Sequence, residues 1–348
     1  MDTISFGLDI FGDLAFDDKG QLTTYAQAIR QVQREGILAD QLGVDIFALG
    51  EHHRPDYAIS SPEMVLAAIA SQTKRIKLSS GVTVLSSEDP VRVFERFATL
   101  DAVSNGRAEI ILGRGSFTES FPLFGYDLTD YNELFEEKTA LFKQLLSEKP
   151  VTWQGKMRAP LKNADVFPKT AGGNIETWIG VGGSPESIIR AARYSFPVVL
   201  AVIGGAPERF KPYIDLYHRA AEKLGTTVGP VGIHSHGFVS NNNEEAVNGA
   251  WRTIRAMLDK IGSERGWAAM SEEQFQQEIL NGSMYVGTPE IVAVKIAHVI
   301  KNLQLQRFDL VYGAGKQTIA ERLQTITLYA NEVIPRVKFL LKDEKEVY

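Results

Sequence analysis

The sequence contains no cysteine, and this absence removes several classes of site at once. Without thiols the chain cannot form a disulfide framework, a thiolate metal site or a cysteine nucleophile. It also lacks any apolar run of the roughly 20 residues that a membrane-spanning helix requires. Its first residues, MDTISFGLDIF, lack the basic segment and apolar core of a secretory signal. We therefore expect a soluble, cytoplasmic protein that does not act at a membrane.

An excess of positive charge is missing as well. The 37 lysines and arginines are outnumbered by 43 aspartates and glutamates, so the formal net charge is −6. Proteins that bind nucleic acid usually present a basic face, and we expect no nucleic-acid partner here. The sequence also lacks the G-x-G-x-x-G fingerprint of a dinucleotide site.

The sequence does contain a regular alternation of short β-branched runs with longer helical patterns. The candidate strands are 4–10, 45–50, 76–85, 107–113, 176–181, 196–202, 232–240 and 307–313. Eight strands, each followed by a helix, are the pattern of an α/β protein with a (β/α)8 TIM barrel. Such a barrel needs about 250 residues. We therefore expect a single domain over 1–348 with loop insertions near 115–130, 150–175 (a hairpin) and 262–286.

Five predicted helices share one type of start, with proline at the first helical position. These prolines are Pro62, Pro90, Pro185, Pro207 and Pro289. Proline fits this position because its missing N–H would have no partner there. In four of the five, the preceding residue carries a side-chain oxygen that can cap the helix, namely Ser61, Asp89, Ser184 and Thr288. These repeated helix starts support the predicted alternation of strands and helices independently of the residues' secondary-structure propensities.

Catalytic residues of such barrels follow the C-terminal ends of the strands. The second strand ends in Glu51-His52-His53-Arg54, although the chain has only six histidines. Adjacent residues of an extended segment point to opposite sides, so only one histidine should face the barrel mouth. His52, with an unperturbed pKa of about 6.5, could act as a general base. The alternative is that both histidines are structural.

Glycines follow two other strands where a ligand phosphate could bind. Gly182 and Gly183 precede Ser184 at a helix start, where free N–H groups and the helix dipole favour an anion. The alternative is an ordinary helix start, and Glu186 opposes a phosphate unless its side chain points away. Arg114, flanked by glycines, can bind a phosphate or a carbonyl, or form a surface ion pair instead.

Two further groups of residues allow more than one reading. His234 and His236 lie two apart on one strand, so they share a face and could bind a metal or line the mouth as polar groups. The second group consists of aromatic residues that could form a wall of the pocket or simply pack in the core or at the surface. They are Phe11, Tyr57, Phe117, Phe121 and Phe124.

Three stretches together resemble the bacterial luciferase-like family of flavin-dependent monooxygenases. They are LGEHHRPDYAISSPE, IKLSSGVTVLSSEDPVRVFERFATLDAVSNGRAEIILGRGS and IGVGGSPES, and YVGTPEIVAVKI and EVIPRV are similar too. The resemblance implies a TIM barrel that binds FMN at its mouth. It further implies that reduced FMN, supplied by a separate flavin reductase, acts with O₂ on a small organic substrate that is apolar or carbonyl-containing. Members are commonly homo-oligomers.

The resemblance also assigns roles to individual residues. It makes His52 the catalytic imidazole and Glu51 the acid before it. It assigns cofactor contacts to three groups of residues. Gly81, Val82 and Thr83 form a strand bulge with a cis peptide bond beneath the flavin ring. Arg114 and Ser116 contact the phosphate and ribityl chain, and Gly182, Gly183 and Ser184 form a phosphate loop. Bacterial luciferase carries a reactive cysteine where this chain has Gly113, so light emission is not expected.

Three other functions remain open on the sequence. An F420-dependent oxidoreductase would share the barrel and transfer hydride without O₂. A flavin-binding protein without turnover would also share the resemblance. A metal-dependent hydrolase would use His52, His53, His234 and His236, whereas the monooxygenase reading needs no metal. For the monooxygenase we expect 115–130 and 262–286 to form a lid that excludes water.

Overall fold

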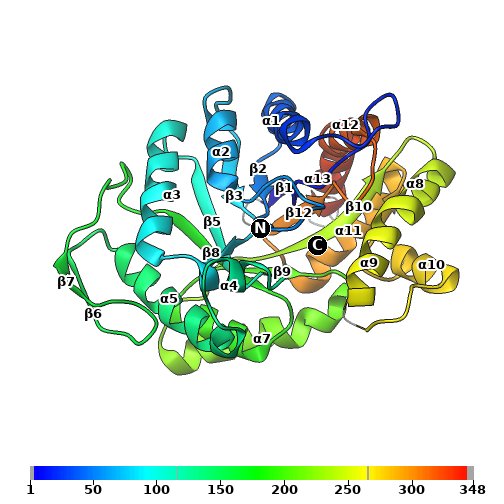
Figure 1. Cartoon of the computed structure of the whole chain (residues 1–348). Coiled ribbons are helices and arrows are strands. Elements are labelled where there is room, and N and C mark those ends of the chain that lie inside the picture. The colour runs from blue at the N-terminus through cyan, green and yellow to red at the C-terminus, as the bar shows by residue number, and fades with distance from the viewer. Residues whose placement is uncertain (1–3, 116, 265, 343–348) are drawn as a thin grey trace.

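The computed structural model describes residues 4–115, 117–264 and 266–342, and it confirms the predicted barrel (Figure 1). Eight parallel strands close on themselves, with β9 pairing β10 and β12 pairing β1. In barrel order they are β1 (Ser5–Ile10), β2 (Ile46–Leu49), β3 (Lys77–Ser80), β5 (Ala108–Gly113), β8 (Glu176–Val181), β9 (Val198–Ala201), β10 (Val231–Val239) and β12 (Arg307–Val311).

Thirteen α-helices are present in the described part of the chain, and most of them surround the barrel (Figure 1). They are α1 (Tyr25–Gln41), α2 (Pro62–Ala70), α3 (Pro90–Ser104), α4 (Ser120–Leu123), α5 (Tyr131–Leu145), α6 (Pro185–Tyr194), α7 (Lys211–Leu224), α8 (Asn243–Ala250), α9 (Ala256–Glu264), α10 (Glu272–Leu280), α11 (Pro289–Leu303), α12 (Ile319–Leu328) and α13 (Ile334–Lys342). None of them is long and apolar enough to cross a membrane.

The proline starts are confirmed, but the predicted caps are only half right. Asp89 and Ser184 accept hydrogen bonds from first-turn N–H groups of α3 and α6. Ser61 and Thr288 make no such bond, because their side chains do not reach the exposed N–H groups. Pro207 begins a short 3₁₀-helix that leads into α7.

Two predicted segments are more divided than expected. The run 76–85 is split into β3 and the two-residue strand β4 (Thr83–Val84), with a cis peptide bond between Gly81 and Val82. The insertion at 262–286 carries α10 and β11 (Tyr285–Gly287), and β11 pairs with the C-terminal end of β10. The hairpin predicted in 150–175 is confirmed as the antiparallel pair β6 (Val151–Trp153) and β7 (Leu161–Ala164).

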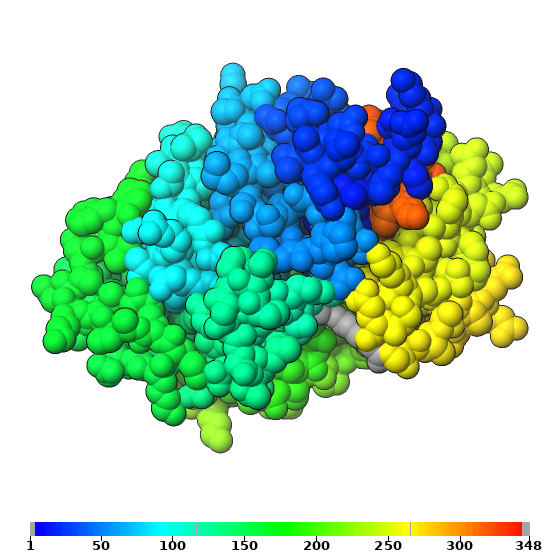
Figure 2. All heavy atoms as spheres, viewed as in Figure 1, coloured from blue at the N-terminus to red at the C-terminus, as the bar shows by residue number. Residues whose placement is uncertain are grey.

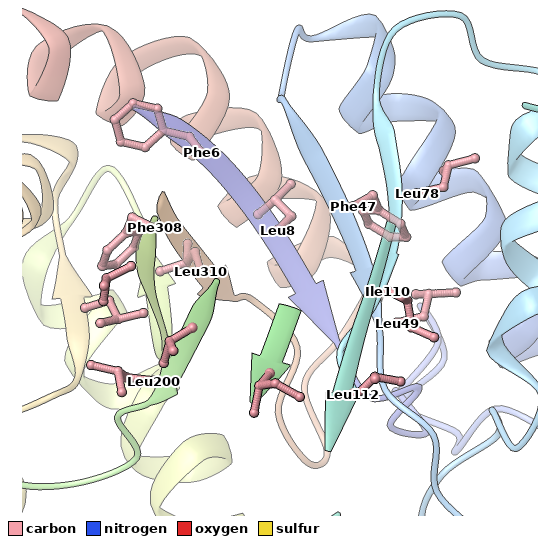
Figure 3. Packing of buried hydrophobic residues seen from close by; sticks show 14 of the residues in the cluster. Phe6, Leu8, Phe47, Leu49, Leu78, Ile110, Leu112, Leu200, Phe308 and Leu310 are labelled. Atoms are coloured by element: carbon pink, nitrogen blue, oxygen red, sulfur yellow. The ribbon is translucent and has the colours of Figure 1, made fainter. Parts of the chain in front are cut away.

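The hydrophobic core lies mainly between the barrel and the helices. Alternate residues of each strand belong to it, including Phe6 and Leu8 on β1 and Phe308 and Leu310 on β12 (Figure 3). Because successive side chains of a strand point to opposite faces, the residues between them point into the barrel. Those residues include buried charged groups such as Asp9, Glu109 and Asp309, and also a small apolar cluster of Ile111, Trp178 and Val199. The barrel interior therefore differs chemically from the mainly apolar layer around it.

An ion-pair network occupies the barrel interior near the N-terminal ends of the strands, which we call the lower end; the C-terminal ends form the upper end. Arg307 on β12 contacts Asp309 on its own strand at 2.7 Å, and its Nη1 lies 2.5 Å from Glu109 Oε1 on β5. Strands β1, β2 and β3 separate β12 from β5 in the sheet, so the second contact crosses the barrel. The three side chains are about 1% exposed, so Arg307 offsets the charge of the two carboxylates away from water, and Lys77 Nζ lies 3.9 Å from the other oxygen of Glu109.

Candidate active site

A cavity of about 440 Å³ opens at the C-terminal ends of the barrel strands. It is the place where active sites of TIM barrels lie. The structure brings eight of the predicted site residues to its walls, namely Glu51, His52, Gly81, Val82, Arg114, Gly182, Gly183 and Ser184. Thr83 does not line it, and Ser116 lies outside the described residues. We call this space the mouth cavity.

His52 faces the mouth cavity, whereas His53 turns to the other side, as the alternation predicted. The His52 ring packs against Tyr57, Phe117 and Phe11, with ring centroids 4.4, 5.1 and 5.3 Å away. His53 Nε2 lies 3.0 Å from Glu51 Oε1. The two neighbours therefore differ in role, with one at the cavity and one holding the loop.

The surroundings of His52 change its acid–base behaviour from what the sequence suggested. Burial among these rings, followed by the charges of Arg54 and His53, lowers the pKa of His52 to about 3. This pKa lies well below the unperturbed value of about 6.5, so His52 is a weaker base than a free imidazole. At neutral pH the imidazole is uncharged and can donate one hydrogen bond and accept another.

Glu51 links the histidine loop to the next strands. Its Oε2 accepts a hydrogen bond from the Val84 N–H at 2.9 Å, while Oε1 contacts His53. The carboxyl group is 5% exposed and lines the cavity, yet both oxygens are already engaged. Thr83 is fully buried and donates to Ser80 Oγ at 2.9 Å. Glu51 and Thr83 thus support the walls of the site.

The cis peptide bond predicted at Gly81–Val82 is present, and it places Val82 across the top of the barrel. A Cβ added at Gly113 would lie only 2.5 Å from Val82 Cγ2, and one at Gly180 would lie 3.0 Å from Val82 Cγ1. Val82 therefore occupies the space above both glycines. This packing explains why position 113, where bacterial luciferase has its cysteine, carries no side chain here.

An anion-binding arrangement lies on the opposite wall, where two predicted features meet. Arg114 Nη2 is 3.4 Å from Ser184 Oγ and 3.3 Å from Ser187 Oγ, at the first turn of α6. A Cβ at Gly182 would meet no atom within 4 Å, so there is open space in front of the helix end. Glu186 is exposed and does not line the cavity. A guanidinium beside a helix N-terminus is well suited to a phosphate.

His234 and His236 also line the mouth cavity, but they are not part of a metal cluster. Nδ1 of His234 lies 2.9 Å from Asp9 Oδ2, within hydrogen-bonding distance. Nε2 of His236 is buried without a hydrogen-bond partner among the described residues, and burial lowers its pKa to about 3. Residues 4–115, 117–264 and 266–342 contain no group of three or more ligands arranged for a metal ion. The geometry of His234 and His236 therefore favours a polar lining of the mouth cavity over a metal site.

The predicted aromatic wall is only partly present. Phe11, Tyr57 and Phe117 line the mouth cavity, whereas Phe121 is fully buried against Tyr131 and Phe124 packs on His53. The sequence analysis missed several wall residues, of which the most prominent are Tyr131, Ile203, Met257, Ile261 and Trp267. Three of these lie in and after α9, and only their apolar character within a polar segment could have indicated them.

Arg54 joins the two segments expected to form a lid. Its Nη1 lies 2.5 Å from Glu119 Oε1 and its Nη2 lies 2.5 Å from Glu264 Oε1. The guanidinium also stands 4.3 Å from the centre of the Phe117 ring, at the cavity wall. In Figure 2 the green-cyan and yellow segments flank the same part of the surface. Both insertions therefore reach the mouth cavity.

Comparison with known proteins gives a consistent result. The sequence profile described as "Luciferase-like monooxygenase" matches residues 11–306. Limonene 1,2-monooxygenase of Rhodococcus erythropolis is 28% identical over 310 residues, covering 85% of this chain and 78% of that protein. The alkanal monooxygenase alpha chain of Photorhabdus laumondii is 23% identical over 362 residues, covering 94% and 98%.

Solved structures show the same fold. A monooxygenase from Streptomyces bottropensis superposes with a TM-score of 0.81 at 21% identity, covering 95% of this chain and 99% of that one. The FMN complex of 3,6-diketocamphane monooxygenase from Pseudomonas putida gives 0.76 at 18%, covering 96% and 99%. The F420-dependent tetrahydromethanopterin reductase of Methanopyrus kandleri gives 0.73 at 20%, also covering 96% and 99%. With the profile match over most of its length, the chain belongs to the luciferase-like monooxygenase family.

Proposed function

We propose that the chain binds FMN in the mouth cavity and uses its reduced form with O₂ to oxidise a small organic molecule. The observation that carries this proposal is the pairing of Arg114 with the N-terminus of α6 on one wall and the uncharged His52 on another. A ligand with a phosphate at one end and a planar, weakly charged ring at the other matches both walls. We further propose that reduced FMN arrives from a separate reductase and that the substrate is apolar or carbonyl-containing.

The residues present fit FMN in three respects. Arg114 and the free N–H groups after Gly183 would hold its phosphate. Gly182 leaves room for backbone contact, and Val82 offers an apolar surface on which the flat ring can lie. His236 Nε2, buried without a partner among the described residues, would gain one from a polar edge of the ring.

The chain's own groups can then support the oxygen chemistry of bound FMN in three ways. Bound reduced FMN would supply the two electrons that convert one atom of O₂ to water while the other enters the substrate. His52, uncharged at neutral pH, can donate a hydrogen bond to a developing oxyanion without adding a fixed charge. The hydrogen bond between Asp9 and His234 holds the imidazole of His234 in place at the cavity wall. Phe117 and Tyr57 exclude water.

The relatives support this proposal without determining its details. One of the two curated relatives is named for oxidation of limonene, an apolar hydrocarbon, and the other for an alkanal. One structural neighbour contains FMN, although another is named for F420. The phosphate-binding wall suits either cofactor, so the choice of FMN needs a direct experiment.

The test is an anaerobic titration of the purified protein with reduced FMN, with F420 in parallel, followed by addition of O₂. We expect reduced FMN to bind. When an accepted substrate is present, the H₂O₂ released per flavin should fall below that of free flavin, because one oxygen atom then enters the substrate and the other leaves as water. In His52→Gln, FMN should still bind while turnover of an accepted substrate drops about a hundredfold or more. His53→Gln is the matched control and should lose far less. Binding of F420 alone would replace the proposal by hydride transfer, and FMN binding with unaltered reoxidation would indicate a protein without turnover.

A further inference from the structure

A second cavity of about 360 Å³ lies beside the mouth cavity. It is bounded by the loop after β1, the loop after β2, the segment 252–261 that leads into and forms most of α9, and the loop after β12. Its volume lies within the range of small-molecule sites. We call it the side cavity. None of the predicted cofactor residues lines it.

The walls of the side cavity are mainly apolar. Leu14, Leu22 and Ala256 line it together with side chains that it shares with the mouth cavity. Most charged groups at its edge are already paired, since Lys260 contacts Asp56 at 2.6 Å and Arg252 contacts Glu321 at 2.5 Å, and Lys316 is the exception among the described residues. An ionic ligand would have to displace these partners, whereas an apolar ligand would simply replace water.

The wall between the two cavities is one side chain thick. Tyr57, Met257 and Ile261 each line both spaces. Met257 is 8% exposed, and methionine is unbranched and adapts its shape to its neighbours, so this wall can shift without moving the backbone. Tyr57 also packs against His52, with ring centroids 4.4 Å apart. The side cavity therefore adjoins the proposed reaction centre directly.

One buried carboxyl group in the wall of the side cavity has an oxygen atom without a hydrogen-bond partner among the described residues. It belongs to Asp13, which is 3% exposed. Its Oδ1 accepts the Gly315 N–H at 2.8 Å, whereas Oδ2 is buried without a hydrogen-bond partner among the described residues. A hydroxyl group on a ligand would supply the missing donor.

We propose that the side cavity holds the apolar body of the substrate, with the reacting end passing the Tyr57–Met257 wall into the mouth cavity. A flavin would take up much of the mouth cavity, so a substrate larger than a few carbon atoms needs this additional space. The ligand class is an extended hydrocarbon or terpene-like skeleton that is uncharged and carries at most isolated hydroxyl groups. The inference rests on the proposed function for the position of the reacting end.

The test measures binding of hexanol, octanol and decanol, as unreactive probes, to the flavin-free protein by calorimetry. The affinity of the unaltered protein should rise by about five- to tenfold with each pair of methylene groups. Leu22→Trp fills the side cavity from a position outside the mouth cavity. It should remove most of the gain between octanol and decanol while leaving the FMN affinity within about twofold, because no flavin contact changes.

Leu224→Trp is the matched control, because Leu224 is 47% exposed and Leu22 is 48% exposed, and Leu224 lines neither cavity. Ala256→Trp fills the side cavity from another element and should reproduce the result if Leu22→Trp folds poorly. Equal chain-length gains in both filling variants and the control, or no alcohol binding at all, would overturn the inference. Loss of FMN binding with an intact alcohol series would overturn only the proposed function.

Discussion

The buried polar groups at the two ends of the barrel differ in charge: those at the lower end form ion pairs, whereas the histidines at the upper end are uncharged. At the lower end, Arg307, Glu109 and Asp309 are fully buried, and each has an oppositely charged partner within 2.7 Å. At the upper end, His52 and His236 are held uncharged, and the described residues leave the Nε2 of His236 without a partner. At the lower end the charges are therefore paired within the protein, although each of the three side chains keeps one buried atom without a hydrogen-bond partner among the described residues. At the upper end, by contrast, uncharged imidazoles line a cavity that a ligand can enter.

This contrast shows how one set of strands serves two purposes. Strand β12 begins with Arg307 in the ion-pair network, and β10 ends near His236 at the mouth. The same alternation of inward and outward residues therefore provides charge pairs at one level and a ligand-binding surface at another. We expect mutations at the two ends to separate stability from ligand binding, and four experiments test that separation.

The largest effect should follow the removal of the central cation at the lower end. Arg307→Met leaves Glu109 and Asp309 buried without their partner, which should lower the free energy of unfolding by about 3–5 kcal/mol. Urea denaturation of the flavin-free protein measures this change. Arg114→Met is the matched control at the mouth, where we expect less than about 1 kcal/mol. Equal losses from the two variants would contradict the contrast.

The response to pH should also differ between the ends. The folded pKa of His52 and of His236 is about 3, below the unfolded value of about 6.5, so the unfolded chain binds more protons between these values. Each histidine should therefore cost about 1–2 kcal/mol of stability as the pH falls from 7 to 5. Burial raises the pKa of Asp309 to about 6, and its contribution has the opposite sign, being lost as the pH rises towards 6.

Comparison of the unaltered protein with the His52→Gln/His236→Gln double variant isolates the contribution of the mouth. Unfolding free energies measured from pH 7 to pH 5 should fall less steeply in the double variant. An unchanged slope would show that these histidines are protonated in the folded protein, and the description of the upper end as uncharged would have to be withdrawn.

The next effect concerns ligand binding at the mouth. Arg114→Met should weaken FMN binding by about tenfold to a hundredfold, because a hydrogen bond to a charged phosphate is lost. Arg193→Met is the control, since Arg193 is on the same helix α6 but pairs with Glu136 away from the cavity. Fluorescence titration measures both, and a similar loss in the control would indicate a general charge effect at α6.

The smallest effect is expected at the lid segments. Arg54→Met removes the contacts to Glu119 and Glu264, and such ion pairs at the surface contribute less than about 1 kcal/mol to stability. During turnover of an accepted substrate, the H₂O₂ released per reduced flavin should nevertheless rise about two- to threefold, since water gains access. Arg96→Met is the control, because Arg96 likewise bridges two carboxylates, Glu63 and Glu88, but contacts neither lid segment. An equal rise in the control would exclude a specific role for Arg54.

The sequence predicted the barrel well because its signals are local. β-branched runs, helical periodicity and proline starts each depend on neighbouring residues, and the structure confirms them. The caps at Ser61 and Thr288 were wrong because a suitable side chain does not guarantee a suitable geometry. For the same local reason the orientation of His52 and His53 could be predicted, since it follows from strand alternation.

The properties of the site depended on contacts between distant parts of the chain. The low pKa of His52 comes from burial, and the rings around it include Phe11 and Phe117, which lie on separate loops. The absence of a side chain at Gly113 reflects contact with Val82 across two strands. No spacing rule connects these positions. The aromatic wall was accordingly predicted only in part, and the residues of α9 were missed.

The position of Arg54 has a consequence for changing the specificity of this enzyme by exchanging loops. Its partners Glu119 and Glu264 lie 65 and 210 positions further along the chain, on different insertions. A loop transplanted from a relative into either insertion alone would leave one carboxylate contact of Arg54 unmatched, next to His52 and His53. The two insertions and the histidine loop therefore form one exchangeable unit, and recombination between relatives should preserve them together or replace all three.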